Sequence, residues 1–372
     1  MTAPNVTARI LRLIVENSPI SQSDLKVRSG LSMSTVSQAA NRLLTQGVIH
    51  ELGLRRVSMG RPKMLLGLNP DYASVIGIQL NAERNLIVMT DLTGNLLGEQ
   101  QMPSGAMTPK QLGDALAKFL RTVEDKRVAA IGLALSGLVD PANGSCIRSR
   151  VMEWENVPIA RLLEERFSLP VFIENDANAM AMAALVFGQL GTARSAIIAT
   201  YGKGIGAGIV LDRQLYRGRF GKAGEIGHGL LGDGSQRLLE EVAASQAILN
   251  RFNASGGEQV TTLQALDINP DRETLKILTE AGEHLGMSLA NLSVAFDPDV
   301  VFLAMEPHMA SRILLDAVTQ SFQTYRLKLS PHMTPLQFLT DSNRMWALGA
   351  AGFAVNQLLN ILSAEADREP EE

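Results

Sequence analysis

Two helical patterns near the start of the chain are separated by about four residues, which is the spacing of a helix-turn-helix motif. The first, residues 21–30, opens with a capping box and ends at a glycine. The second, residues 32–47, begins at a serine cap and also ends at a glycine. An apolar stripe over residues 6–14 predicts a third helix before them. The chain is therefore predicted to begin with a small helical domain.

The outward face of the last of these helices is polar but carries little charge. A surface helix more often exposes Glu and Lys, whereas small and amide side chains suit base edges and phosphates in the major groove of DNA. A three-helix protein-interaction module is the alternative explanation. The side chains predicted to contact DNA are Ser34, Thr35, Ser37, Gln38, Asn41 and Arg42.

A basic loop follows, between two short strand patterns over residues 48–52 and 64–68. It contains Gly60-Arg61-Pro62, and an arginine in an extended segment of this kind suits a narrow minor groove. Helices, turn and loop together predict a winged helix-turn-helix DNA-binding domain over residues 1–70, the head. The DNA contacts predicted for the wing are Arg55, Arg56, Arg61 and Lys63.

The charge of the chain is divided unevenly between the head and the remainder, the body. The head contains nine basic and three acidic residues, a net charge of +6, whereas the body contains 25 basic and 35 acidic residues, a net charge of −10. This division indicates that the head binds a polyanion and that the body has another role. Taken alone, the charge also fits a small domain that is basic by chance.

The body alternates strands with helices, which predicts an α/β fold. A strand meander over 74–97 precedes a helix at 109–123 and a buried strand at 128–135, and a second strand pair occupies 197–211. Two groups of strands that each open with a meander indicate two lobes. Further helices are predicted near residues 236–251, 271–296, 309–326 and 343–361.

Composition excludes several classes of protein. The single cysteine, Cys146, rules out an intrachain disulfide and a metal site built on four thiolates. The first residues lack the apolar block of about 7–15 residues that marks a secretory signal, and no apolar run approaches ~18 residues. We therefore expect a cytoplasmic protein without a membrane-spanning helix, ending in an acidic, disordered tail over residues 363–372.

A strand followed by a helix places Asn175 and Asp176 at their junction. A carboxylate accepts hydrogen bonds and an amide both donates and accepts them, so this pair suits adjacent hydroxyls of a polyol. In an enzyme, Asp176 would serve as general base on a sugar hydroxyl. A capped helix N-terminus explains the same residues without a ligand.

Glu225 and His228 are three residues apart, so both side chains can point into one pocket from a turn. The glycine-rich bend at 201–208 lets backbone N–H groups approach an anion such as phosphate. Each pattern has a plainer explanation. The first fits an exposed polar turn, and the second fits a tight connection between two strands.

In their order and spacing, these motifs resemble the ROK family of repressors, open reading frames and sugar kinases, from about Asn5 to Leu359. The resemblance implies a winged helix-turn-helix followed by a two-lobed actin/hexokinase-like, ribonuclease H-like fold. The implied lobes are 71–190, with the C-terminal helix packed back on it, and 191–342. The motifs that carry the resemblance are Gly60-Arg61-Pro62, Gly137–Gly144, Trp154–Pro158, Glu174–Asn178, Gly204–Gly208 and Gly224–His228.

The resemblance also implies a sugar held between the lobes. The family's last sugar-binding glutamate lies four residues before a serine, and Glu241 meets that spacing to Ser245, with Glu240 as the second choice. Carboxylate, amide and imidazole groups together suit hydroxyls, which both donate and accept. The implied sugar contacts are Asn175, Asp176, Glu225, His228 and Glu241.

Departures from the family argue against catalysis. Kinase members carry an Asp-x-Gly-x-Thr loop for ATP, and the matching stretch here, residues 77–84, lacks all three residues. The strand end at 301–307 is too bulky where a Gly-Gly pair would back the adenosine. Because phosphoryl transfer depends on positioning and charge neutralisation, we predict that the body is not an enzyme and takes no cofactor.

Two further departures concern ligands. The family's zinc-binding cysteine run falls on residues 232–239, which contain no thiolate, so we predict no bound metal. The loop of His228 is then held by packing, or sugar binding is weaker. Arg150 replaces an asparagine of the family and suits an anionic sugar derivative, although an arginine turned to solvent fits equally.

The resemblance thus implies a sugar-responsive DNA-binding regulator, a repressor of carbohydrate uptake or catabolism genes whose degenerate kinase body senses the effector. Its implied partners are double-stranded operator DNA, a sugar or sugar derivative, and a second copy of the chain in a homodimer or a dimer of dimers. One alternative is a sugar kinase that phosphorylates a hexose or amino sugar with ATP, with Asp176 as the base. Another is a repressor controlled by a protein partner.

Overall fold

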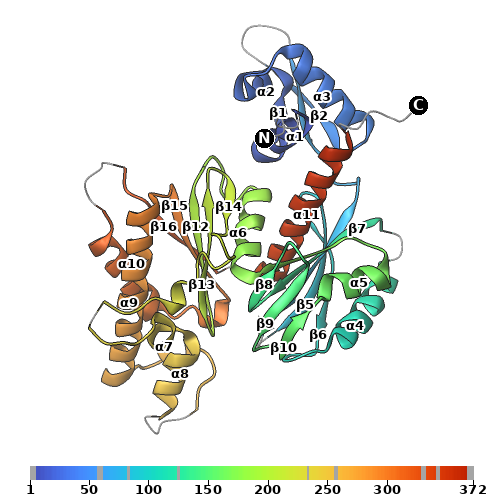
Figure 1. Cartoon of the computed structure of the whole chain (residues 1–372). Coiled ribbons are helices and arrows are strands. Elements are labelled where there is room, and N and C mark those ends of the chain that lie inside the picture. The colour runs from blue at the N-terminus through green and yellow to red at the C-terminus, as the bar shows by residue number, and fades with distance from the viewer. Residues whose placement is uncertain are drawn as a thin grey trace. The chain divides into compact units, whose positions relative to one another are not determined.

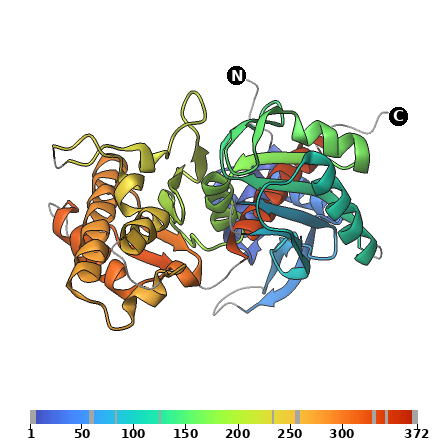
Figure 2. The ribbon, with the colours of Figure 1, turned by 90° about the horizontal axis from the view of Figure 1, so that it is seen from below.

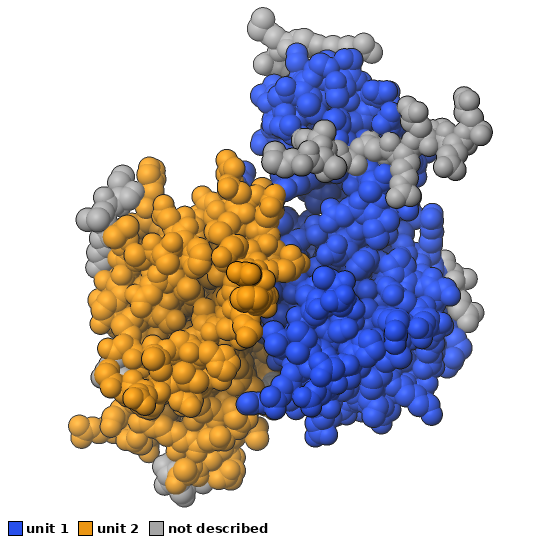
Figure 3. Space-filling view, viewed as in Figure 1, with its two compact units in different colours: residues 1–192, 346–372 blue, residues 193–345 orange. Residues whose placement is uncertain are grey.

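A computed structural model describes residues 6–56, 62–81, 84–123, 126–232, 234–254, 259–327, 332–340 and 344–366. The chain forms two compact units, coloured in Figure 3. Unit 1 comprises residues 1–192 and 346–372, and unit 2 comprises residues 193–345.

The head has the predicted winged helix-turn-helix fold (Figure 1). Ser21 and Ser32 cap the second and third helices, because each side chain accepts a hydrogen bond from the backbone N–H three residues on. Gly30, with a φ of 68°, ends the second helix in the left-handed conformation that favours glycine. The elements are α1 (Val6–Asn17), β1 (Ile20–Ser21), α2 (Gln22–Ser29), α3 (Met33–Thr45), β2 (Ile49–Arg55) and β3 (Lys63–Leu68).

The rest of unit 1 is built on a five-stranded sheet with the order β11-β7-β4-β5-β6. The first three strands along the chain form an antiparallel meander, and β7 and β11 then add in parallel. These strands are β4 (Ser74–Leu80), β5 (Asn85–Asp91), β6 (Leu96–Met102), β7 (Val128–Leu135) and β11 (Val171–Asn175). A small sheet that the sequence patterns did not predict contains β8 (Leu138–Asp140), β9 (Ser145–Ser149) and β10 (Trp154–Val157). The helices are α4 (Pro109–Thr122), α5 (Ile159–Phe167), α6 (Asp176–Val186) and α11 (Met345–Ala366).

Helix α11 lies against the sheet of unit 1 and is red in Figures 1 and 2. Its backbone approaches the sheet so closely that a Cβ on Gly77 or Gly132 would overlap a carbonyl oxygen of the helix, that of Ala347 or Ala350. By length and composition alone, α11 is apolar enough to cross a membrane, a property that the lack of a long unbroken apolar run did not predict. Since 61% of its apolar window is buried inside the protein, its packing against the sheet accounts for its apolar composition.

Unit 2 repeats the plan of unit 1. Its sheet has the order β14-β13-β12-β15-β16, again a three-stranded meander followed by two parallel additions. The strands are β12 (Ala196–Tyr201), β13 (Ile205–Leu211), β14 (Gln214–Tyr216), β15 (Val300–Met305) and β16 (Leu336–Leu339). The helices are η1 (Ile226–His228), α7 (Leu239–Ala243), α8 (Ser245–Ala254), η2 (Gln264–Asp267), α9 (Arg272–Phe296), η3 (Pro307–Met309) and α10 (Arg312–Tyr325). The repeated strand order confirms the duplicated actin/hexokinase-like fold.

Some helix boundaries differ from their predictions. The helix predicted over 236–251 is two helices, because Ala244 between α7 and α8 is extended. The helix predicted over 309–326 starts only at Arg312, where Ser311 caps it. Helix α11 continues to Ala366, so the described part of the predicted tail is helical, and residues 367–372 lie outside the described residues.

Candidate functional site

Two of the predicted DNA contacts, Ser34 and Thr35, form hydrogen bonds within the N-terminal turn of α3. The Ser32 hydroxyl lies 2.8 Å from the hydroxyl of Ser34 and 2.7 Å from that of Thr35. It also accepts from the Thr35 backbone N–H at 3.1 Å. These hydroxyls therefore form the helix cap, while the side chains of Ser32 and Ser34 remain exposed.

The outward stripe of α3 is not uniform. The Ser37 hydroxyl donates to Gln22 Oε1 at 2.8 Å, so this residue ties α3 to α2. Gln38, the next residue, is exposed, and so are Asn41 and Arg42 about one turn further on. The two amides and the guanidinium therefore form the part of α3 that presents donors and acceptors outward.

The base of the wing carries a charge cluster that the sequence patterns did not reveal. Asp24 accepts from Arg55 Nη2 at 2.6 Å and from Lys63 Nζ at 3.0 Å, so its carboxylate joins α2 to both wing strands. Burial raises the pKa of Asp24, but hydrogen bonds from Lys63, Ser21 and Arg55 outweigh burial and lower it to about 2. Arg56 is exposed, and Arg61 lies outside the described residues.

In unit 1, Asn175 is the N-cap of α6. Its Oδ1 accepts from the N–H groups of Ala177 and Asn178, at 3.0 and 3.4 Å, and its Nδ2 donates to the Gly137 carbonyl at 3.2 Å. The amide is therefore held by backbone on both sides. The capping explanation of this motif is correct for Asn175.

Asp176 occupies the first turn of α6, where its Oδ1 accepts from the Ala177 N–H at 2.9 Å. It is half-buried, and the helix dipole favours its negative charge. Behind it, the buried Glu174 accepts from Asn178 Nδ2 at 3.2 Å and from the Asn175 N–H at 3.1 Å. The residues on both sides of Asp176 are thus held by hydrogen bonds.

In unit 2, Glu225 is the N-cap of η1 and His228 is its last residue, and both are exposed. Two glycines shape this turn. A Cβ on Gly224, whose φ is +92°, would overlap the Ala207 carbonyl, and a Cβ on Gly227 would lie 2.5 Å from the Ile205 carbonyl. The turn therefore lies directly on strand β13.

The two candidate glutamates have different roles. Glu241 Oε2 accepts from the Leu238 backbone N–H at 2.8 Å, so its carboxylate caps α7. Glu240 Oε1 lies 3.9 Å from His228 Nε2. The structure therefore brings Glu240, the second choice from the spacing, to His228, and it engages Glu241 elsewhere. Because adjacent residues on a helix point about 100° apart, spacing to Ser245 alone did not separate them.

The stretches matched to nucleotide-binding motifs place a neutral amide and a carboxylate near the positions expected for phosphate, although the glycine turn also contains the exposed Lys203. Gln79, in the stretch 77–84, is 1% exposed, and neither of its amide atoms has a hydrogen-bond partner among the described residues. The turn Gly202–Gly204 connects β12 to β13, and a Cβ on Gly204 would lie 3.9 Å from Glu240 Oε2. A carboxylate at this distance disfavours a bound phosphate.

The two remaining predictions concern Arg150 and the groups that could bind a metal. Arg150 is exposed in the turn after β9, which fits the solvent-facing alternative. Within the described parts of the chain, no three His, Cys, Asp or Glu side chains are grouped to hold a metal ion. The Cys146 thiol is buried, and this burial raises its pKa to about 11, which disfavours the thiolate form that binds metals.

The head and the body together define a class of protein, a winged helix-turn-helix joined to a duplicated sugar-kinase-like fold. Comparison with known families supports both parts. Residues 75–356 match the ROK family, and residues 1–53 match the MarR family. The chain belongs to the ROK family.

Two relatives and one solved structure resemble the chain over most of its length. NagC of Escherichia coli, a DNA-binding transcriptional dual regulator, is 28% identical over 378 residues, covering 95% of this chain and 93% of NagC. The xylose repressor of Bacillus spizizenii is 30% identical over 309 residues, covering 79% of this chain and 80% of that repressor. The crystal structure of a ROK family transcriptional regulator, a homologue of the E. coli MLC protein, has the same fold, with a TM-score of 0.81 at 24% identity over 97% of this chain and 98% of that one.

Proposed function

We propose that this protein is a sugar-responsive transcriptional repressor that acts in the cytoplasm on genes of carbohydrate uptake or catabolism. The observation that carries the proposal is the match to NagC, which spans head and body together. A winged head with an outward-facing polar helix suits DNA binding, which is not part of the activity of a sugar kinase. Degenerate kinase lobes, with a carboxylate after β11 and carboxylates and an imidazole around η1 and α7, supply a sugar sensor.

In this proposal, Gln38, Asn41 and Arg42 read base edges in the major groove. Amides pair with adenine through two hydrogen bonds, and arginine pairs with guanine in the same way. Ser34 and Thr35, at the N-terminus of α3, contact phosphate, and Ser37 holds the helix in place through Gln22. Arg55, Arg56, Arg61 and Lys63 place the wing on the DNA backbone and in the minor groove.

Selecting genomic fragments with the purified protein and sequencing them tests the DNA-binding role. We expect a few palindromic sites, whose neighbouring genes then identify the sugar. Gln38→Ala is expected to weaken operator binding by about 1–3 kcal/mol and to relax specificity at one base pair. Gln101→Ala, an exposed glutamine of β6 in the body, is the matched control and leaves binding unchanged. No enriched site, with or without sugars, would contradict the proposal.

A separate variant tests the wing. Arg61→Ala is expected to weaken binding to all sequences alike and to lower the slope of log K against log salt by about 1, as removal of one phosphate contact does. Titrations at several salt concentrations measure this slope. An unchanged slope would remove Arg61 from the interface while leaving the helix contacts in place.

Sugar contacts are proposed in each unit, and the contacts of one unit are called its half-site. In unit 1 the proposed contact is Asp176, beside the capping residue Asn175, and in unit 2 the proposed contacts are Glu225, His228 and Glu240. We keep Glu241 as the cap of α7 rather than a sugar contact, because its carboxylate is already bonded to the Leu238 N–H. Ligand binding changes operator affinity only if the ligand binds the two head arrangements unequally.

Calorimetric titration with D-xylose, N-acetylglucosamine, glucose and their phosphate esters tests the effector. One sugar is expected to bind and to lower operator affinity, and Asp176→Asn is expected to abolish both effects. Glu241→Gln, by contrast, is expected to leave the sugar Kd nearly unchanged. If saturating sugars never shift operator affinity, the effector part of the proposal is wrong, and pull-down from cytosol and membranes tests control by a protein partner.

The proposal includes no phosphoryl transfer and no metal. Gln79 is neutral and buried, and the Glu240 carboxylate faces the glycine turn, so neither side chain attracts the phosphates of ATP. We expect no ATP-dependent phosphorylation of hexoses or amino sugars, and no stoichiometric zinc by metal analysis. Turnover that Asp176→Asn abolishes would instead establish the kinase alternative.

Oligomerisation completes the proposal. A homodimer, or a dimer of dimers, places two heads on successive major grooves of a palindromic operator. Light scattering of the free protein and of its operator complex is expected to give two or four chains. A monomer on a full operator would contradict this part.

A further inference from the structure

A short loop joins η1 to α7 in unit 2. We call its described residues, 229–232 and 234–238, the return loop. The Leu239 N–H donates to the Gly229 carbonyl at 2.8 Å, and the Leu231 N–H donates to the Arg237 carbonyl at 3.0 Å. Leu230 and Leu238 form an antiparallel bridge between these bonds. The return loop is therefore a narrow hairpin whose ends are His228 on one side and α7 on the other.

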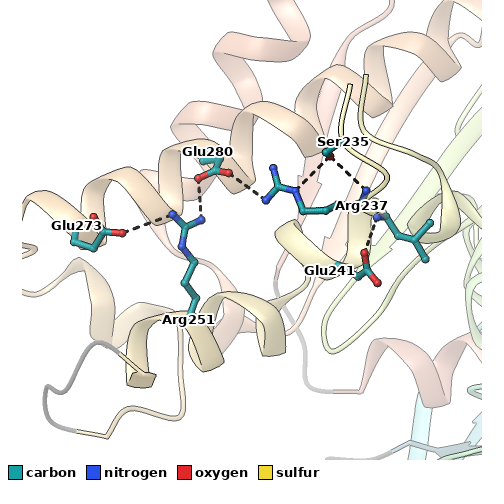
Figure 4. Close-up of polar contacts among 7 residues, drawn as sticks. Ser235, Arg237, Glu241, Arg251, Glu273 and Glu280 are labelled. Atoms are coloured by element: carbon teal, nitrogen blue, oxygen red, sulfur yellow. Dashed lines mark hydrogen bonds and ion pairs between the residues drawn. The ribbon is translucent and has the colours of Figure 1, made fainter. Parts of the chain in front are cut away.

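An ion network ties this hairpin to two helices (Figure 4). Arg237 Nη1 lies 3.7 Å from Glu280 Oε1 on α9, and Glu280 Oε2 accepts from Arg251 Nη1 of α8 at 2.8 Å. Arg251 Nη2 in turn lies 3.6 Å from Glu273 Oε1. Ser235 Oγ accepts from both the backbone N–H and Nε of Arg237, at 3.4 Å each. Arg237 thus connects the C-terminal segment of the return loop to helices of the unit 2 core.

This connection matters because the His228 side chain has little packing of its own. The His228 side chain is 62% exposed and that of Glu240 is 33% exposed. Leu231, which pairs with Arg237 across the hairpin, and Leu239 are buried and anchor the same end of it. A shift of the hairpin moves His228 at one end and Glu240 at the other.

We propose that Arg237 and Glu280 are positioning residues that hold the return loop and thereby set the geometry of His228 and Glu240 for ligand binding. The inference rests on the proposed sugar effector and deepens it. Residues 232–239 contain no cysteine, so the tie is made by charge pairs rather than by thiolates on a metal. Ligand affinity is therefore sensitive to ionic strength and insensitive to chelators, since salt screens partly exposed charges.

Hydrogen exchange of the full chain tests the tether directly. In Arg237→Gln, the Leu231 and Leu239 amides are expected to exchange faster, while the amides of β12 keep their wild-type rates. Arg237→Lys retains the charge and is expected to restore much of the protection. The matched control is Arg194→Gln, which removes an arginine from an exposed ion pair with Asp212 elsewhere in unit 2. If the Leu231 and Leu239 amides exchange at their wild-type rates in Arg237→Gln, Arg237 does not hold the return loop.

Calorimetry then tests the positioning role with the sugar of the panel that binds the wild type. Arg237→Gln and Glu280→Gln are each expected to raise the sugar Kd by up to about fivefold, the range of an exposed ion pair, with little change in Tm. The wild-type Kd is expected to rise between about 50 mM and about 500 mM NaCl, and the Arg237→Gln Kd to change less. EDTA is expected to change neither value.

The outcomes separate this inference from the proposed function. If the wild type binds a sugar and Arg237→Gln binds it with the same Kd and salt dependence, the positioning role is wrong and the effector stands. If the wild type binds none of the sugars, the effector falls and with it the ligand part of the inference. The exchange rates then still decide whether Arg237 holds the loop.

Discussion

The two units have the same strand order but hold their candidate site residues by different means. In unit 1, Asn175 is fixed by backbone groups of α6 and by the Gly137 carbonyl, and it lies on a sheet in direct contact with α11. In unit 2, Glu225 and His228 are exposed on a turn, and the loop that follows them is tied by ion pairs. The site residues of unit 1 are thus held in place by backbone contacts and packing, and those of unit 2 by ion pairs.

This contrast indicates which of the two units tolerates changes in its sequence. A glycine-lined sheet packed on a helix backbone tolerates almost no added atom, because the overlap cannot relax. An exposed loop needs only some tie to the core, and either a metal or a charge network meets that need. We therefore expect salt and pH to affect the unit 2 half-site more strongly, and substitutions to affect the unit 1 half-site more strongly.

The largest effect is expected at the contact between β7 and α11. Gly132→Ala places a Cβ against the Ala350 carbonyl and is expected to destabilise the protein by about 3 kcal/mol, in the upper range for overpacking. The control is Gly98→Ala in β6, where the nearest atom would lie at an ordinary 3.6 Å. Urea unfolding measures both. Equal stabilities would show that packing is not the dominant constraint in unit 1.

The helix caps offer the next test. Asn175→Ala removes two hydrogen bonds to the N-terminus of α6 and is expected to cost about 1–2 kcal/mol of unfolding free energy. Glu225 occupies the equivalent cap position of η1 without a side-chain cap bond, so Glu225→Ala is expected to change stability by less than about 0.5 kcal/mol. A larger loss at Glu225 would reverse the comparison.

Gln79 offers a test in the opposite direction. Both of its amide atoms are buried without a partner among the described residues, which is costly relative to an apolar side chain of similar shape. Gln79→Met is therefore expected to raise the unfolding free energy by about 1 kcal/mol, visible as a higher urea midpoint. A lower midpoint would mean that the amide is satisfied in solution, and that this end of β4 retains a polar function.

The smallest expected effect is a response of the return loop to acid. The hydrogen bond from Arg251 lowers the pKa of Glu280, with partial burial opposing it and the charges of Arg251, Arg237 and His284 adding to it. Its stabilisation is therefore complete above the unfolded-state value of 4.5 and is lost as the pH falls through the lower folded-state value. In the wild type, the Leu231 amide is expected to exchange faster as the pH falls through this range. In Glu280→Gln, which has no carboxylate at this position, the Leu231 amide is expected to show no further loss of protection. Parallel loss at Ala177, beside the Asn175 cap, would contradict the contrast between the units.

Much of the architecture was predictable because local signals were strong. Serine caps, a turn of fixed spacing and terminal glycines located the three head helices, and the two strand meanders indicated a two-lobed body. The small sheet of β8–β10 was not predicted, because its short strands at 138–157 have no distinct periodicity. Helix α11 was located, but its apolar composition is explained only by the sheet that it covers.

For the candidate site, sequence order identified the residue types, and long-range contacts assigned their roles. Motif spacing selected Glu241, yet the turn of α7 points Glu240 toward His228 and uses Glu241 as a cap. Similarly, Asp24 had the spacing of a capping box, but its carboxylate meets Arg55 and Lys63, far along the chain. Side-chain roles of this kind depend on which distant groups the fold brings within hydrogen-bond distance.

The amino-acid sequence was thus enough for the class of head, the α/β character of the body and the set of polar residues from which a site can be built. These follow from local propensity and periodicity, which act over a few residues. The tertiary structure was needed for the partner of each charge, the choice between adjacent glutamates and the tether of the return loop. Each of these joins segments that are distant in the chain, and a one-dimensional pattern has no signal for a contact that arises only when helices and strands pack.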